Sequence, residues 1–473
     1  MPTECIPQQL EFQGIGLRKV VADFSGGRIT SDAGGLLLRE IATGTKVLER
    51  FAECFADNRN QAIIEHTKLE LLSQRVLGIA LGYEDLNDHD DLRGDALLAT
   101  LVGKIDPSGN GRARERDKGF PLAGKSTLNR LELAPAGVPY KHRYHKIVCD
   151  PEKVDRFFVD AFLNAHSEAP DKIILDFDAT DDPLHGDQEG RFFNGYYDCY
   201  CYMPLYVFCG DHLLCARLRP SNIDASLGSE AELERIVGQI REQWPEVQII
   251  LRADSGFCRP DLMDWCDENS VDYILGMSRS SRLIARIAKQ MKKAKKRFWK
   301  TQESARYYRD FKFRTRKSWS RSRRVVGKAE QIRGKENPRF VVTSLSKEDY
   351  CAQALYEDLY CARGDMENRI KEQQLCLFAD RTSSATFSAN HLRLWFSGVA
   401  YVLLTELRRV GLKGTELERA QCGTIRNKLL KIGAQVSLSV RRVWVRCAGG
   451  FPYQKLFAQV FANLRREYRT ASG

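Results

Sequence analysis

Acidic residues close two apolar runs that have the composition of buried strands. The first run, ILDFD at 174–178, carries Asp176 and Asp178, and the second, IILRAD at 249–254, ends on Asp254. Burying a carboxylate without a partner is costly. If the two strands are neighbours, their terminal acids can share a divalent cation, because hard cations such as Mg²⁺ take carboxylate oxygens as ligands. The alternative is that these aspartates only begin turns, where Asp is common, but the matching contexts favour the shared site.

A third acid belongs to a predicted helix within DLYCARGDMENRIKEQ at 358–373. Positions three and four apart lie on one face of a helix, so Tyr360, Arg363, Glu367 and Lys371 form one stripe. A solvated salt-bridge face is the alternative, although apolar residues on the neighbouring faces indicate that the stripe borders packed structure. The flanking cations favour an ionised glutamate. Three carboxylates from separate segments can hold two metal ions across a phosphodiester.

The elements that would position these acids alternate between strands and helices. We expect strands at 172–178, 203–208, 213–218, 247–254 and 271–277, and helices at 229–243 and 260–269. The sequence therefore predicts an α/β fold with a mixed sheet flanked by helices.

The chain on either side of these elements has different textures. Residues 1–150 are predicted to be mostly helical, with Leu69, Leu72, Val76 and Ile79 on one stripe and Gly82 as its cap. We divide the chain into five regions. A helical region (1–150) is followed by the first part of the core (171–281), a basic β-rich antiparallel insertion (282–345), the second part of the core (346–411) and a C-terminal region (412–473).

Composition places the chain among ordinary globular proteins. Of its 473 residues, 43% are hydrophobic and 29% charged, and the net charge of +11 makes an acidic partner such as nucleic acid plausible without proving it. The longest apolar run, near 394–407, is too short to span a bilayer, and the N-terminus has no secretory signal pattern. None of the 14 cysteines forms a C-x-x-C pair, which argues against structural zinc and favours reduced thiols.

The segment GFPLAGKS at 119–126 formally matches a phosphate-binding loop, but we do not interpret it as a nucleotide site. Such a loop needs a buried strand before it, whereas SGNGRARERDK precedes it here, and Pro121 removes an amide that would bind phosphate. We therefore predict a polar loop followed by a helix. Lys125 and Arg130, in KSTLNRLE, are expected to contact DNA phosphates.

The acidic motifs, together with YMPLYVF, LRPSN and YCARGDMENRIKEQ, resemble the catalytic core of DDE transposases, most closely the IS1380 family of the IS4-like group. ITSDAGGLLLREI, LLSQRVLGIALGYEDLND and KSTLNRLE resemble that family's leader region. The resemblance runs from about residue 28 to about residue 460, and the order and spacing of the motifs make it specific.

The resemblance implies an RNase H-like core in which Asp178, Asp254 and Glu367 are catalytic and hold two Mg²⁺ ions, with Mn²⁺ as a substitute. Asp176 is the rival first ligand, and Asp178 is preferred because it ends the strand within D-A-T. His185, in the following loop, is not expected to be a ligand.

The resemblance also implies a set of DNA contacts. The IS4-like signature Y-(2)-R-(3)-E-(6)-K assigns Tyr360 and Arg363 to DNA binding, but Gln374 stands at the lysine position and Lys371 is the substitute. Trp299 and Trp319, each among cations in the insertion, are candidates to stack on a displaced base. The alternative is that they pack the core of the insertion.

The expected function is a transposase that binds the terminal inverted repeats of an insertion sequence, cuts both ends and joins the 3′-hydroxyls to target DNA. The expected partners are double-stranded DNA and a second copy in a homodimeric synaptic complex, with no membrane, in the bacterial cytoplasm at the nucleoid. The rivals are an RNase H-like nuclease or resolvase without strand transfer, and a non-catalytic DNA-binding relic.

Overall fold

The computed structural model describes residues 9–133 and 146–470, which form two compact units. Of the described residues, the first unit contains 9–52, 57–131 and 406–470, so segments from early and late in the sequence fold together. The second contains 53–56 and 132–405, which include both parts of the predicted core and the insertion between them. Cys5 lies outside the described residues, and every described cysteine is a free thiol.

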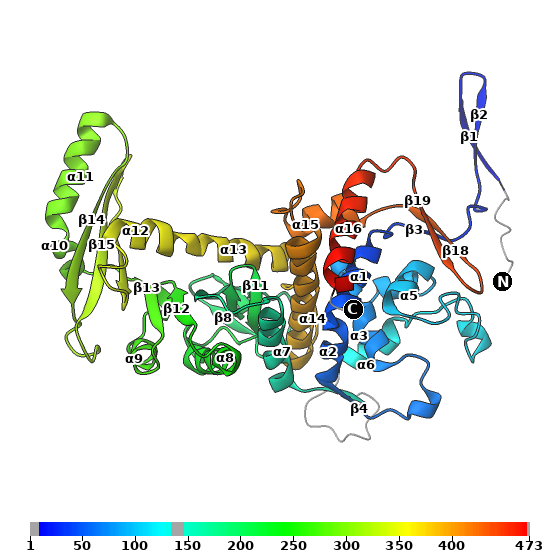
Figure 1. Ribbon diagram of the computed structural model, residues 1–473, viewed down its shortest axis with the longest axis horizontal. Coiled ribbons are helices and arrows are strands. Elements are labelled where there is room, and N and C mark those ends of the chain that lie inside the picture. Colours follow the sequence, from blue (N-terminus) through cyan, green and yellow to red (C-terminus); the bar gives the residue numbers. More distant parts are fainter. Residues whose placement is uncertain (1–8, 134–145, 471–473) are drawn as a thin grey trace. The chain divides into compact units, whose positions relative to one another are not determined.

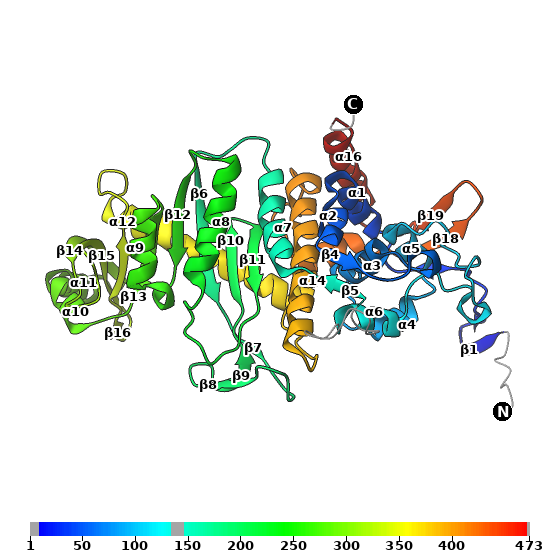
Figure 2. The same cartoon turned by 90° about the horizontal axis from the view of Figure 1, so that it is seen from below.

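The second unit is built on one large mixed sheet (Figures 1 and 2). Its strands, in spatial order, are β11 (His212–Arg217), β10 (Leu205–Cys209), β6 (Lys172–Ala179), β12 (Gln248–Ala253), β13 (Asp272–Met277), β17 (Arg339–Thr343), β15 (Arg323–Ile332) and β14 (Ala305–Phe313), with β16 (Lys335–Glu336) paired to β15. The first three are antiparallel, and β6, β12 and β13 are parallel. This arrangement is an RNase H-like core, and all five core strands predicted from apolar patterning are confirmed.

The insertion is β-rich and antiparallel, as predicted, but it is not a separate sheet. Strands β17, β15 and β14 continue the core sheet from β13, because β13 pairs with β17 through Ile274–Met277. Two helices precede these strands, α10 (Ser281–Arg286) and α11 (Ala288–Thr301). Joining the sheet satisfies the backbone groups on the edge of β13, which would otherwise be open to pairing with another chain.

Helices cover both faces of the large sheet, as both views show. One face packs against α7 (Pro151–Asn164), α8 (Ser229–Gln243) and α9 (Pro260–Glu268), and this core includes Leu175 and Phe177. The opposite face, with Ile250 and Ile274, packs against a long irregular helix. That helix contains α12 (Ala352–Ala354), η4 (Leu355–Tyr360), η5 (Cys361–Arg363), α13 (Gly364–Lys371) and η6 (Glu372–Cys376).

The remaining elements of the second unit are short strands and one long helix. They are β4 (Phe55–Asp57) paired with β5 (Ile147–Cys149), the small sheet of β7 (Asp182–Pro183), β9 (Cys199–Tyr202) and β8 (Phe192–Asn194), the turn η3 (Ser255–Phe257) and the helix α14 (Phe387–Glu406). No helix among residues 9–133 and 146–470 has the length and apolar character needed to cross a membrane.

The first unit is mainly helical, as predicted, but it opens with strands. A Gly16 turn with φ 61° joins β1 (Leu10–Ile15) to β2 (Arg18–Ala22), a hairpin that the helical prediction for this region missed. Its helical elements are α1 (Gly35–Thr45), α2 (Val47–Glu53), η1 (Gln61–Ile63), α3 (Lys68–Leu81), α4 (Asp88–Leu92), α5 (Ala96–Val102), η2 (Glu115–Asp117), α6 (Lys125–Glu132), η7 (Leu407–Gly411), α15 (Cys422–Ile425), η8 (Arg426–Leu430) and α16 (Gln454–Thr470). Of the stripe predicted in α3, Leu72, Val76 and Ile79 are buried and Leu69 is half-buried, and Gly82 caps the helix with φ 99°.

The two ends of the chain share a sheet in the first unit. Strand β3 (Ile29–Thr30) pairs with β18 (Ala434–Leu438), which forms a hairpin with β19 (Val443–Cys447). This pairing explains why residues more than 400 positions apart belong to one unit.

Candidate active site

The predicted acidic strand ends are neighbours in the sheet. Strands β6 and β12 pair in parallel with Asp176 opposite Arg252, so Asp178 and Asp254 lie at the same sheet edge. Successive residues of a strand point to opposite faces. Because Leu175 and Phe177 face the α7–α9 core, the acids of β6 face the irregular helix instead.

Arg363 connects this edge to the third acid. Its guanidinium donates to Asp178 Oδ2 over 3.0 Å and to Glu367 Oε1 over 2.5 Å. The Asp178 side chain is 15% exposed and that of Glu367 is 45% exposed, so Glu367 is the more accessible of the two acids to solvent. The stripe predicted on the helix is thus placed over the strand ends.

The three acids share one electrostatic environment. Burial raises the pKa of Asp178 to about 6; Arg363 opposes this rise, and the charges of Asp254 and Glu367 add to it. Burial alone would lower the pKa of Arg363, but the carboxylates of Asp178 and Glu367 lead to a net rise. The carboxylates repel one another, and the Arg363 guanidinium lies among them. Such a cluster of negative charge attracts cations and is typical of a functional site.

Asp176, the rival ligand, has a structural partner. Arg252 donates from Nε to Asp176 Oδ1 over 2.5 Å and from Nη2 to Oδ2 over 2.7 Å, and both side chains are buried. The third donor of Arg252 reaches the Leu359 carbonyl at 2.6 Å. Arg252 therefore fastens the helix to the sheet and occupies both carboxylate oxygens of Asp176, which favours Asp178 as the acid available to other ligands.

The donor set suits a hard divalent cation, because it consists of carboxylate oxygens at one edge of a sheet. In the described part of the chain, no three His, Cys, Asp or Glu residues are arranged closely enough to hold a metal ion. Arg363 supplies the positive charge between Asp178 and Glu367. The residues fit a metal chemically, and binding would require Glu367 to exchange its contact with Arg363 for one with the ion.

Gly276 gives Tyr360 its place beside the site. A Cβ on this residue of β13 would lie 2.5 Å from the Tyr360 hydroxyl, 2.9 Å from the Ser255 backbone nitrogen and 3.1 Å from the Asp254 carbonyl carbon. Burial raises the pKa of Tyr360, Arg363 opposes the rise, and Asp254 adds to it. The absence of a side chain at 276 therefore sets the distance between the helix and the strand end.

We expect Gly276→Ala to destabilise the protein by about 1–3 kcal/mol, the usual cost of overpacking, and to lower DNA cleavage by displacing Tyr360 or Asp254. Urea denaturation and cleavage rates would measure both effects. Adding Tyr360→Phe should restore part of the stability because it removes the closest contact. Gly238→Ala on α8 is the matched control, since a Cβ there meets nothing within 4 Å; an equal loss in both variants would contradict this role of Gly276.

Gln374 stands where the family signature has lysine, and it serves a different contact. Its amide donates to the Asp181 carbonyl over 3.1 Å and to Asp182 Oδ1 over 2.9 Å. Burial raises the pKa of Asp182 to about 8, and the hydrogen bond from Gln374 opposes the rise. Lys371, one turn after Glu367, is exposed and remains the candidate for the phosphate contact.

We expect Asp182→Asn to stabilise the protein increasingly between pH 4 and 8. The pKa of Asp182 is higher in the folded protein than in the unfolded chain, where it is near 3.8. The protonated carboxyl therefore contributes its full stabilisation below pH 3.8, and this contribution to the free energy of unfolding is lost as the pH rises toward about 8. Asparagine keeps the acceptor for Gln374 and does not ionise. Urea denaturation at several pH values would show wild type and variant diverging, and parallel curves would contradict the assignment.

The remaining predicted DNA contacts fall in different places. Trp299 on α11 is 66% exposed, as a stacking residue requires. Trp319 is 4% exposed and packs edge-on against Phe313, so packing of the insertion core, the alternative considered, describes it and stacking on DNA does not. Lys125 and Arg130 are exposed on α6 of the first unit, whereas the predicted catalytic acids belong to the second unit.

The phosphate-loop pattern has the structure predicted for it. The segment directly before Gly119, residues 103–118, contains only the short 3₁₀ turn η2 and no strand, and α6 begins at Lys125. Lys125 contacts Asp90, 3.4 Å from its ammonium group. His185 is exposed in the loop after β7.

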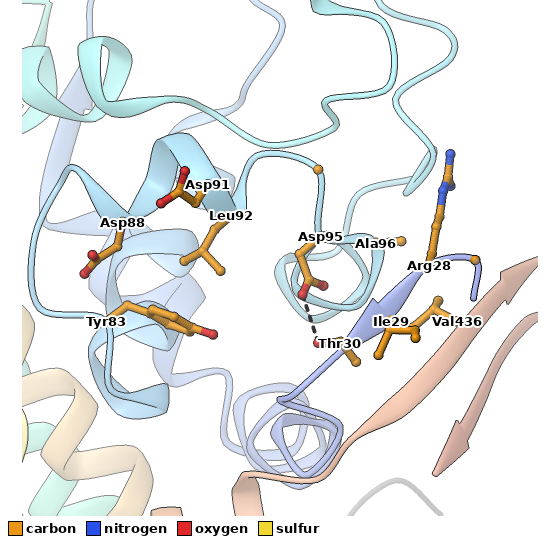
Figure 3. Close-up of a pocket in the computed structure, with 12 residues that line it drawn as sticks. Arg28, Ile29, Thr30, Tyr83, Asp88, Asp91, Leu92, Asp95, Ala96 and Val436 are labelled. Carbon is orange, nitrogen blue, oxygen red and sulfur yellow. Dashed lines mark hydrogen bonds between the residues drawn. The ribbon is translucent and has the colours of Figure 1, made fainter. Parts of the chain in front are cut away.

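A cavity of about 500 Å³ in the first unit is separate from the predicted catalytic acids (Figure 3). Asp88, Asp91, Asp95 and Arg28 line it, and Asp95 accepts a 2.9 Å hydrogen bond from Thr30. None of the predicted catalytic acids lines this cavity. The cavity therefore adds nothing to the candidate site at the strand ends of the second unit.

Sequence patterns did not identify Arg252, Gly276 or Gln374 as residues that organise the site. The signal for Arg252 was present, since an arginine inside the apolar run IILRAD must find a buried partner. Gly276 sits in the strand DYILGM, where an isolated glycine indicates close approach of another segment.

Comparison with known proteins relates the chain to a family. No curated protein matches the chain significantly. Among solved structures, it is similar to the piggyBac transposase in a synaptic complex with hairpin DNA, with 10% identity, a TM-score of 0.40, and coverage of 94% of this chain and 85% of that one. At these values the likeness assigns no residue. The family described as transposase DDE domain group 1 matches residues 12–469, nearly the whole sequence, and the chain therefore belongs to this family of DDE transposases.

Proposed function

We propose that this transposase is of the IS1380 type within the IS4-like group, and that it binds terminal inverted repeats, cuts the element ends and joins their 3′-hydroxyls to target DNA. The observation that carries the proposal is the meeting of two parallel strand ends, Asp178 and Asp254, with Glu367 of the covering helix. Family membership supports the general activity.

In this proposal Asp178, Asp254 and Glu367 are the catalytic acids and hold two Mg²⁺ ions, for which Mn²⁺ substitutes. When bound, such ions activate the attacking oxygen and stabilise the leaving oxygen of an in-line displacement. Arg363 holds Asp178 and Glu367 in place through its two hydrogen bonds. Tyr360, half-buried and packed against Gly276, fixes the distance between the helix and Asp254.

The proposed DNA contacts surround this edge and extend to the insertion. Helix α11 buries Met291, Ala294 and Phe298 and presents seven Lys and Arg residues and Trp299 elsewhere on its surface. Arginine and lysine side chains bind phosphates, and an exposed aromatic ring stacks on an unpaired base. Tyr360, Arg363 and Lys371 would contact DNA at the core.

The first unit is proposed to bind DNA through Lys125 and Arg130 and to contribute to dimerisation. These roles are proposed for the regions 1–150 and 412–473, whose described residues largely make up this unit. We propose a homodimer in the synaptic complex, acting in the bacterial cytoplasm at the nucleoid. A nuclease or resolvase, and a DNA-binding relic, remain the alternatives to be tested.

The decisive experiment is a cleavage and strand-transfer assay on DNA that carries the flanking inverted repeats, with Mg²⁺ or with EDTA. Wild type should cut at the repeat ends and join them to a second DNA, and Glu367→Gln should do neither. Asp365→Asn, an exposed residue two positions earlier on the same helix, removes the same charge and should keep both activities.

The other outcomes separate the rivals. Cutting without joining would establish the nuclease or resolvase, and binding without chemistry in any divalent metal would establish the relic. If Asp365→Asn lost activity together with Glu367→Gln, local helix damage would explain the loss and the catalytic assignment of Glu367 would fail.

A further inference from the structure

The β18–β19 hairpin of the first unit has a fixed base and a free end. Ala434 and Val436 of β18 are buried, and β18 is anchored by its pairing with β3 at the same end. Beyond this base the two strands continue as a ribbon, paired from Ala434–Cys447 to Leu438–Val443. In Figure 2 the ribbon projects away from the helices of its unit.

One face of the ribbon is cationic and aromatic. Trp444 and Arg446 lie on one face of β19, because they are two residues apart, and Arg442, directly before the strand, reaches the same face at Trp444. Both guanidinium groups lie 5.5 Å from the Trp444 ring, which is 47% exposed. Arg446 also donates to Ser437 Oγ over 2.6 Å across the strands, so the face is preorganised.

The charge of this face is not balanced by acids. Between Glu418 and Glu467 the sequence has ten Lys and Arg residues and no Asp or Glu. Within the described residues, Arg441, Arg442 and Arg446 form no ion pair, whereas most arginines of the large sheet do. Unpaired cations on an exposed ribbon attract anionic partners.

We propose that the β18–β19 hairpin is a DNA-binding ribbon that lies in a groove of duplex DNA, with Arg442 and Arg446 on the phosphates. A two-stranded ribbon fits the major groove of B-DNA. Val440, fully exposed at the tip beside Arg441, is positioned to enter the groove. This proposal rests on the proposed function for the identity of the DNA and adds an anchoring surface outside the catalytic unit.

The test is fluorescence anisotropy of a fluorescein-labelled DNA duplex titrated with full-length protein over a range of salt concentrations. Each phosphate contact contributes about 0.9 to the slope of log affinity against log salt. The double variant R442A/R446A should therefore have a slope shallower by about two and an affinity at 0.1 M salt lower by roughly tenfold or more. The charge-preserving R442K/R446K should keep the wild-type slope.

K153A/R156A on α7 is the matched control, because it also removes two exposed cations, which are already paired with Asp150 and Glu242. It should leave the slope unchanged. A wild-type slope in R442A/R446A would overturn the ribbon proposal alone, and a shift of that variant to a smaller oligomer with DNA affinity intact would identify a protein interface instead. Absence of binding by wild type would overturn the proposed function as well.

Discussion

Replacing Asp178 with Asn is expected to abolish metal-dependent DNA cleavage, with a loss of about a thousandfold or more, because a metal ion contributes several kcal/mol to the stabilisation of the transition state. Asparagine keeps the shape of the side chain and an acceptor for Arg363, but it removes the charge that attracts a cation. DNA binding should persist or strengthen, since one negative charge near the phosphates is lost. The rate of strand cleavage should therefore fall while the DNA affinity stays the same or rises.

Asp187→Asn is the control for this change, since its side chain is fully exposed in the loop beyond the same strand. A titration with Mn²⁺ followed by paramagnetic resonance would report metal binding without chemistry, and Asp178→Asn should bind fewer or weaker ions. Full activity of Asp178→Asn with intact metal binding would transfer the first ligand to another acid and refute the triad as assigned.

The sequence predicted the strands of the catalytic core because their apolar runs are bounded by turns and helices of ordinary length. The spacing of Asp176 and Asp178 places both side chains on one strand face. It could not separate their roles, because the separation depends on Arg252, which lies 76 positions later and becomes a partner only through the parallel pairing of β6 and β12. Long-range pairing of this kind has no local signal.

Other differences have the same physical origin. The strands of the insertion were visible as β-type runs, but their joining of the core sheet depends on which edge β13 leaves open. Trp319 among cations read equally well as a DNA contact or as core, and only its packing against Phe313 decides between them. The first hairpin was missed although Leu10 and Phe12 alternate with Glu11 and Gln13, because this run is short and its side chains are mostly exposed rather than packed on a core.

Arg252→Met is expected to lower the free energy of unfolding of the second unit by about 3–5 kcal/mol, the cost of leaving one partner of a buried ion pair uncompensated. The loss should exceed that of Arg156→Met, whose exposed pair with Glu242 is worth less than about 1 kcal/mol. Urea denaturation followed by tryptophan fluorescence measures both.

The double variant Asp176→Leu/Arg252→Met separates two effects of losing Arg252: the unpaired buried charge of Asp176 and the lost hydrogen bond to the Leu359 carbonyl. Replacing both members by apolar residues of similar size removes the buried charge together with its partner, so much of the stability should return. DNA cleavage should not return with it, because Arg252 also holds the Leu359 carbonyl and thereby the turn that carries Tyr360 to the site. Recovery of stability without activity would show that the buried pair positions the catalytic helix, whereas recovery of both would leave Arg252 only a structural part.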